Sequence, residues 1–218
     1  LYLQDGSDPP IQLTDDAQQD KNPVFSDDGE KVVFLRGDIP QDLYSINAVG
    51  GQEQLLVSGS VLSKLDLGYY ELSEIQSFAF IPGTHQLLFN TCDIRFDDLK
   101  PEDCLRQASK SNNDLLLVDV DTKKIMRLLE PGQGGNFAIS PDGKFIAVQG
   151  PAQIAIVELD GEIHHRDLIY IDPRQRYEGD PVMNWTEDGS EVIVTLPVGL
   201  EVAHGFIPDV GSVLRYPI

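Results

Sequence analysis

NFAISPDGKFIAV, at Asn136–Val148, is the stretch that decides the fold, because three other segments repeat its pattern. They are PVFSDDGEKVVF at Pro23–Phe34, SFAFIPGTHQLLF at Ser77–Phe89 and VMNWTEDGSEVIV at Val182–Val194. Each segment has an apolar stretch, a polar turn and a second apolar stretch. The two stretches are held seven positions apart, as from Ile139 to Ile146. Apolar and β-branched residues on both sides of a short polar turn predict a β-hairpin.

The turns have their own chemistry. Three of them contain Asp followed by Gly, as in Pro141-Asp142-Gly143. Gly takes a positive φ without a Cβ clash, and Asp bonds to its own backbone. In the second repeat the glycine, Gly83, falls one place early after Pro82, which predicts a different turn type there.

A second pair of strands follows each of the first three hairpins, at Asp42–Val57, Asp114–Leu129 and Gln153–Ile171. Each unit is therefore expected to hold four antiparallel strands, here called a to d. Successive repeats lie 55, 59 and 46 residues apart, counted between Phe25, Phe80, Ile139 and Trp185. Four-stranded units of this period are typical of propeller blades. The sequence predicts an all-β fold, a β-propeller of four-stranded antiparallel blades.

Three of these pieces carry a resemblance to a known family. SPDGKFIAV at Ser140–Val148, SDDGEKVVF at Ser26–Phe34 and DLYSINAVGG at Asp42–Gly51 resemble the TolB-type propeller repeat, a WD-like repeat rich in Pro-Asp-Gly turns. The resemblance covers nearly the whole chain. It implies a fold rather than a function, since such blades occur in periplasmic, cell-surface and peptidase-associated proteins.

We expect residues 1–218 to form one propeller domain. Complete blades are predicted at about residues 21–60, 74–132 and 133–172, with partial blades at 1–20 and 180–218. Both ends supply a strand c, at Leu1–Thr14 and Ser212–Ile218, which favours a partial ring of a larger propeller. The alternative is a five-bladed ring in which one of these strands is an ordinary loop.

Meander topology separates the connections between two faces. The a→b and c→d turns are short, whereas the b→c and d→a connections hold the long segments Ser58–Ser77, Asn90–Asn113, Asp172–Asp180 and Pro197–Gly211. Long loops on a rigid scaffold commonly carry function, and aromatic and Arg side chains are enriched at binding sites. The predicted binding residues on this long-loop face are Tyr69, Tyr70, Arg95, Arg106, Arg174, Arg176, Tyr177 and His204. The alternative is that they only pack or solvate their loops.

The two cysteines, Cys92 and Cys104, both fall in the Asn90–Asn113 insertion. This placement predicts a structural disulfide, which would place the protein outside the reducing cytosol. The alternative is a pair of reduced thiols. No second Cys or His pair with zinc-ligand spacing lies near them, and Asp119 and Asp121 lack the Gly and Glu of an EF-hand loop. No metal or cofactor is predicted.

Composition excludes other classes. Asp and Glu number 36 against 16 Lys and Arg, a formal charge of −20, so a nucleic acid would be repelled. No apolar run is long enough to span a membrane. The chain contains no G-x-S-x-G, HExxH or P-loop motif.

The predicted function is therefore a non-catalytic binding or scaffold propeller outside the cytoplasm, which engages a protein or polymer partner on the long-loop face. It is not expected to be an enzyme. The alternative is the propeller domain that gates a serine peptidase of the prolyl oligopeptidase type, with the catalytic domain outside this chain. A third interpretation is a lyase or glycan-processing enzyme whose catalytic residues converge on the channel.

Overall fold

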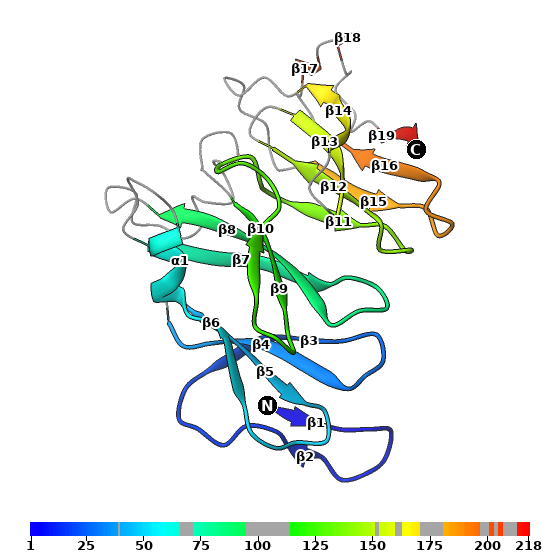
Figure 1. Ribbon diagram of the computed structural model, residues 1–218. Coiled ribbons are helices and arrows are strands. Elements are labelled where there is room, and N and C mark those ends of the chain that lie inside the picture. The colour runs from blue at the N-terminus through cyan, green and yellow to red at the C-terminus, as the bar shows by residue number, and fades with distance from the viewer. Residues whose placement is uncertain are drawn as a thin grey trace.

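The computed structural model describes residues 1–38, 40–65, 72–94, 114–150, 153–159, 163–170, 181–196, 201–202, 205–206 and 213–218. Three four-stranded antiparallel sheets follow one another along these residues (Figure 1). Within each sheet the strands pair in chain order, so each is a meander that begins and ends at opposite edges. The prediction of four-stranded propeller blades is confirmed.

The strands of the three complete blades have three to nine residues, within the usual range for globular proteins. Blade 1 is β3 (Asp20–Phe25), β4 (Lys31–Arg36), β5 (Asp42–Asn47) and β6 (Gln54–Val57). Blade 2 is β7 (Leu72–Phe80), β8 (Gln86–Ile94), β9 (Leu115–Asp119) and β10 (Ile125–Arg127). Blade 3 is β11 (Phe137–Ile139), β12 (Phe145–Gln149), β13 (Gln153–Glu158) and β14 (Ile163–Tyr170).

Smaller sheets lie before and after these blades. Blade 4 has three described strands, β15 (Val182–Trp185), β16 (Glu191–Thr195) and β19 (Val213–Pro217), with β19 paired to β16. A two-stranded hairpin, β17 (Glu201–Val202) and β18 (Gly205–Phe206), falls between β16 and β19 in the chain. At the N-terminus, β1 (Tyr2–Leu3) pairs with β2 (Ile11–Gln12). Helix α1 (Gly59–Leu65) begins the connection from β6 to β7, and no helix of the described residues is long and apolar enough to cross a membrane.

The repeated spacing in the sequence is the register of four hairpins. The two residues at its ends are paired across the strands in every repeat: Phe25 with Val32, Phe80 with Leu87, Ile139 with Ile146 and Trp185 with Val192. The turns that close these hairpins lie along the right-hand side of Figure 1. The turn residues therefore set the same register between the first two strands of each sheet.

The middle strands of the three complete blades are buried on both faces, because each of these blades lies between two neighbouring sheets. On β8, Leu87, Leu88 and Phe89 all have no exposed surface. Side chains alternate across a strand, so Leu87 and Phe89 enter the cluster shared with blade 1, and Leu88 enters the cluster shared with blade 3. Alternate residues of a middle strand therefore belong to two different cores, one shared with the preceding blade and one with the next.

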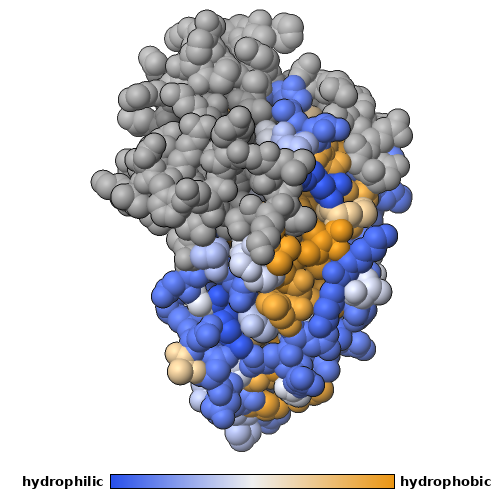
Figure 2. Space-filling model, turned by 60° about the vertical axis from the view of Figure 1, so that its left-hand side comes forward, coloured by the Kyte–Doolittle hydropathy of each residue, from blue (hydrophilic) through white to orange (hydrophobic). Residues whose placement is uncertain are grey.

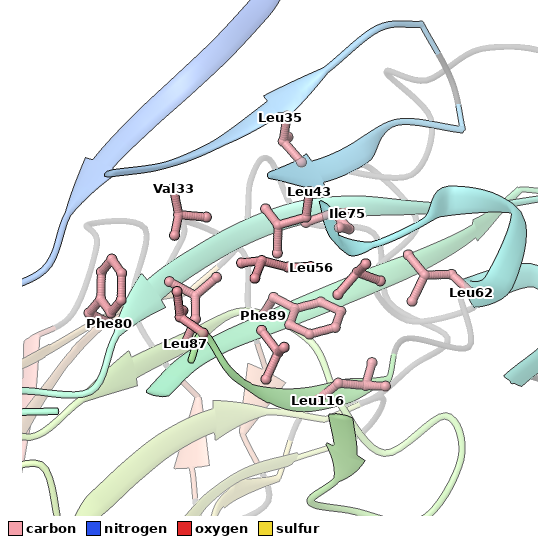
Figure 3. Packing of buried hydrophobic residues seen from close by; sticks show 13 residues of the cluster. Val33, Leu35, Leu43, Leu56, Leu62, Ile75, Phe80, Leu87, Phe89 and Leu116 are labelled. Atoms are coloured by element: carbon pink, nitrogen blue, oxygen red, sulfur yellow. The ribbon is translucent and has the colours of Figure 1, made fainter. Parts of the chain in front are cut away.

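The cores are therefore formed between blades rather than within them. Val33, Leu35 and Leu43 of blade 1 pack towards Leu87 and Phe89 of blade 2, as Figure 3 shows. Another cluster joins blades 2 and 3, and a third joins blades 3 and 4. Fully burying one such side chain stabilises the fold by about 1.5–3 kcal/mol, so these shared cores hold neighbouring blades together.

Candidate functional site

The residues predicted to form the binding surface lie outside the described residues. They are Tyr69, Tyr70, Arg95, Arg106, Arg174, Arg176, Tyr177 and His204. The structure therefore neither gathers nor separates them, and they stay predictions.

The predicted disulfide falls partly within the described chain. Cys92 lies on β8 with 1% of its surface exposed, and no cysteine of the described residues is free. Cys104 lies outside these residues. The bridge stays a prediction, which thiol titration of the denatured, unreduced protein checks: a bridged chain releases no free thiol.

Among the described residues, a polar site lies at the short-turn face. It is built on the β3–β4 turn, whose hydrogen bonds recur in later blades. In the β3–β4 turn the Ser26 hydroxyl donates to Asp28 Oδ1 over 2.6 Å, and the backbone N–H of Glu30 donates to the same oxygen over 3.0 Å. These hydrogen bonds, with smaller help from His85, lower the pKa of the Asp28 carboxyl to about 2. Asp28 is therefore held in place and ionised at neutral pH.

The same turn recurs in two later blades. Ser140 donates to Asp142 in the β11–β12 turn, and Thr186 donates to Asp188 in the β15–β16 turn, each over 2.7 Å. The pKa of Asp188 is likewise lowered to about 2, first by the Thr186 hydroxyl. These two turns are natural comparators for the turn that holds Asp28.

The β7–β8 turn departs from this pattern, as the early glycine predicted. Gly83 has a φ of 71° directly after Pro82, and the Thr84 N–H donates to the Ile81 carbonyl. Proline followed by a residue with positive φ is the arrangement of a type II turn. The next residue, His85, occupies the place of Glu30, Lys144 and Ser190 in the other hairpins.

His85 joins three turns from two blades. Its Nε2 lies 2.8 Å from Asp28 Oδ2 in the β3–β4 turn, and its Nδ1 lies 2.7 Å from Asp121 Oδ2 in the β9–β10 turn. Asp121 and Asp28, in that order, raise the pKa of the imidazole. The Gly83 N–H also donates to Asp27 Oδ2 over 2.7 Å, so blades 1 and 2 are tied together by side chains at this face.

An open hollow lies above these groups. Its volume is about 520 Å³, and its lining includes Asp28, His85, Asp119 and Asp121. Lys31 reaches Asp121 Oδ1 at 3.5 Å and donates to the side-chain oxygen of Asn47. Ionised carboxylates therefore outnumber cations around the hollow, which favours a cationic ligand.

A second charged cluster, at the other end of blade 1, is internally paired. Arg36 is buried and bonds Asp20, with Nε to Oδ1 at 2.7 Å, and it also pairs with Asp16 and Glu53. Its guanidinium lies over the rings of Phe34 and Tyr44. Its partners lie in β3, in the β5–β6 turn and in the segment before β3, so this cluster holds blade 1 together.

His85 is not among the binding residues predicted from the sequence. Asp119 and Asp121 were weighed there only as a calcium loop, and the predicted binding surface lies on the opposite face. The available signal was the break in the repeat, where an imidazole replaces the Glu, Lys or Ser of the other hairpins. Position in the repeat could have identified the residue, although not its two partners.

Comparison with known proteins defines the class by fold alone. No family model matches the chain, and no curated protein matches it. Among solved structures, TolB from Acinetobacter baumannii has a TM-score of 0.50 and 16% identity, covering 96% of this chain and 46% of that one. The β-propeller domain of the Trilobed protease from Pyrococcus furiosus has a TM-score of 0.55 and 8% identity, covering 92% of this chain and 55% of that one.

A third neighbour is an acylaminoacyl peptidase from Pyrococcus horikoshii, with a TM-score of 0.56, 10% identity, 92% of this chain covered and 31% of that one. The chain thus spans from about a third to about half of the length of these three structures. The fold is that of a TolB-like β-propeller, as the repeats predicted. Identities this low say nothing about what the chain binds or does.

Proposed function

We propose that this chain is part of a non-catalytic binding propeller that holds a protein or polymer partner on the long-loop face. The observation that carries the proposal is the distribution of connection lengths. Every turn within the hairpins at one end of the strands has four to seven residues. Four connections at the other end have 11 to 20 residues, namely β6–β7, β8–β9, β14–β15 and β16–β19.

Such a division suits a binding protein. The short turns and the cores between blades supply a fixed frame, and the long connections supply variable surface on one side of it. Figure 2 shows hydrophobic residues of the described surface gathered in a band between hydrophilic ones. Gathered apolar surface often marks a place where another molecule packs.

The partner is proposed to present carboxylates to Arg174 and Arg176. In a chain with 36 acidic and 16 basic residues, two arginines only two positions apart are candidate anchors for an acidic group. Arg binds carboxylates through two parallel hydrogen bonds. The extracytoplasmic location proposed for the protein rests on the predicted pairing of Cys92 with Cys104.

The test compares equal losses of charge on the two faces. A partner captured by the full-length protein from its own cell-envelope extract is titrated by calorimetry against Arg174→Ala and Arg176→Ala. Loss of an interface hot spot costs ~2 kcal/mol or more, about thirtyfold in affinity. The matched variants Lys123→Ala and Lys144→Ala remove the same charge from short turns and should leave affinity unchanged. Equal losses on both faces would refute the assignment of the face.

The alternative, a propeller that gates a prolyl oligopeptidase-type catalytic domain, has a separate test. The full-length protein should then contain a G-x-S-x-G segment outside these residues and should hydrolyse short proline-containing peptides. A full-length protein without this segment and without the hydrolysis removes the alternative.

A further inference from the structure

The hollow between blades 1 and 2 brings together three side chains with metal-binding atoms. One ligand atom from each of Asp28, Glu30 and His85 lies within 4.8 Å of the other two. Two ligands about 2.1 Å from one tetrahedral metal ion lie roughly 3.4 Å apart. The distance of 2.8 Å between His85 Nε2 and Asp28 Oδ2 is that of a hydrogen bond, so the two groups separate by roughly half an ångström to hold an ion between them. We propose that these three residues bind one divalent transition-metal ion.

The orientation of the imidazole supports this site. A histidine that binds a metal through one nitrogen usually donates the other N–H to a carboxylate, which fixes the tautomer and the ring. His85 Nδ1 lies 2.7 Å from Asp121 Oδ2, so Asp121 is placed to receive that proton. In the metal-free protein Nε2 makes a hydrogen bond with Asp28, so an ion replaces the proton on Nε2 while Asp121, as a positioning residue, holds the N–H of Nδ1.

The surroundings favour a cation and leave room for it. The hollow of about 520 Å³ opens directly on Asp28 and His85, so further ligands from solvent or substrate can complete the coordination. On His85 a metal must displace the proton that the two carboxylates favour, so metal and proton compete for Nε2.

The ligand set indicates the kind of metal. An imidazole with two carboxylates suits zinc and similar transition metals, whereas calcium and magnesium prefer sites built of oxygen alone. The turn at Asp142 repeats the geometry of the Asp28 turn, but the residue of the next blade that aligns with His85 is Ser190. Only the blade 1–2 junction of the described residues therefore combines the turn with a histidine.

The test is a titration of the metal-stripped full chain with ZnCl2 at about pH 8, where a histidine is largely neutral. The chain has four histidines, so the measure is the difference between variants rather than total zinc uptake. The site should appear as one zinc per chain, and His85→Gln should abolish it. Asp121→Asn should weaken it ~10–100-fold, and CaCl2 should bind more weakly than ZnCl2.

Asp142→Asn is the matched control, because it removes the same turn carboxylate from a hairpin without the histidine and should leave zinc affinity unchanged. Zinc should also raise the unfolding temperature of the wild-type chain, and not that of His85→Gln. This second measurement shows whether each variant is folded before zinc is added. The proposal is overturned if zinc does not bind, or if His85→Gln binds it as tightly and is stabilised as much as the wild type.

Discussion

Two junctions between blades use the same repeat in different ways. At the junction of blades 3 and 4 the contacts are mostly apolar: Trp185 stacks on Phe145 with ring centroids 6.4 Å apart, and its Nε1–H donates to the Ala138 carbonyl. At the short-turn end of the junction of blades 1 and 2, the contacts are polar, with His85 between two carboxylates. Both junctions also contain an apolar cluster between the two sheets.

This difference separates the apolar contacts that hold the blades together from the polar side chains that are added at one junction. Packing between blades is present at every junction of the complete blades, because each inner strand has side chains on both faces. The polar cluster appears where one turn departs from the repeat. We therefore expect substitutions at the apolar junction to affect mainly stability, and substitutions at the polar junction to affect mainly ligand binding.

The largest effect on stability is expected at Trp185. Trp185→Ala removes the ring from the cluster shared by blades 3 and 4 and should lower the free energy of unfolding by about 3 kcal/mol. Trp185→Phe keeps an aromatic ring but loses the hydrogen bond to Ala138, so it should cost about 1 kcal/mol. Urea unfolding followed by circular dichroism measures both. A Trp185→Ala loss no larger than that of His85→Gln would contradict the comparison.

The next largest effect on stability is expected from Gly143→Ala, at the place where blades 2 and 3 meet. Its φ is 70°, and an added Cβ would lie 3.1 Å from Ile81 Cγ2 and 3.2 Å from the Pro82 carbonyl oxygen. A left-handed conformation costs a non-glycine residue about 1–2 kcal/mol, and the close contact adds to this. Gly29 has nearly the same φ with no neighbour within 4 Å, so Gly29→Ala measures the backbone cost alone. Equal losses in the two variants would show that the contact between turns is unimportant.

A smaller effect on stability is expected from His85→Gln in metal-free buffer. Because Asp28 and Asp121 are about half exposed, their attraction to His85 is screened, and the loss should be about 1 kcal/mol or less. Unfolding measured again in ~1 M salt should show a smaller difference, since salt screens exposed charges. A loss as large as that of Trp185→Ala, or one that salt does not reduce, would mean that His85 serves packing.

The smallest effect is expected at Glu74 on β7, which lies near Lys21 of blade 1. Burial raises the pKa of its carboxyl above 4.5, against hydrogen bonding from Gln76. A raised pKa means that the folded state prefers the protonated group, so this contribution to stability is present at low pH and is lost as the pH rises through the folded-state pKa. Glu74→Gln should therefore gain ~0.5 kcal/mol or less at neutral pH.

The pH series supplies the control for Glu74. Near pH 4 the carboxyl is largely protonated, so Glu74→Gln and the wild type should unfold at the same urea concentration. A variant that is less stable than the wild type at neutral pH would show that ionised Glu74 is favourably paired.

The sequence predicted the hairpins because their information is local. Phe25 and Val32, or Ile139 and Ile146, are joined by a five-residue loop whose Asp and Gly fix both turn and register. The early glycine after Pro82 also signalled a different turn. Four-stranded repeats of this length then left few alternatives to a propeller.

Only the tertiary structure decided which turns meet. His85 is 57 residues from Asp28 and 36 from Asp121, and nothing in the local sequence relates them. Stacking of blades 1 and 2 brings the three turns to one edge, because the cores between blades fix where each sheet lies. The repeat therefore determined each hairpin, whereas the packing of one blade on the next determined that an imidazole and two carboxylates share a hollow.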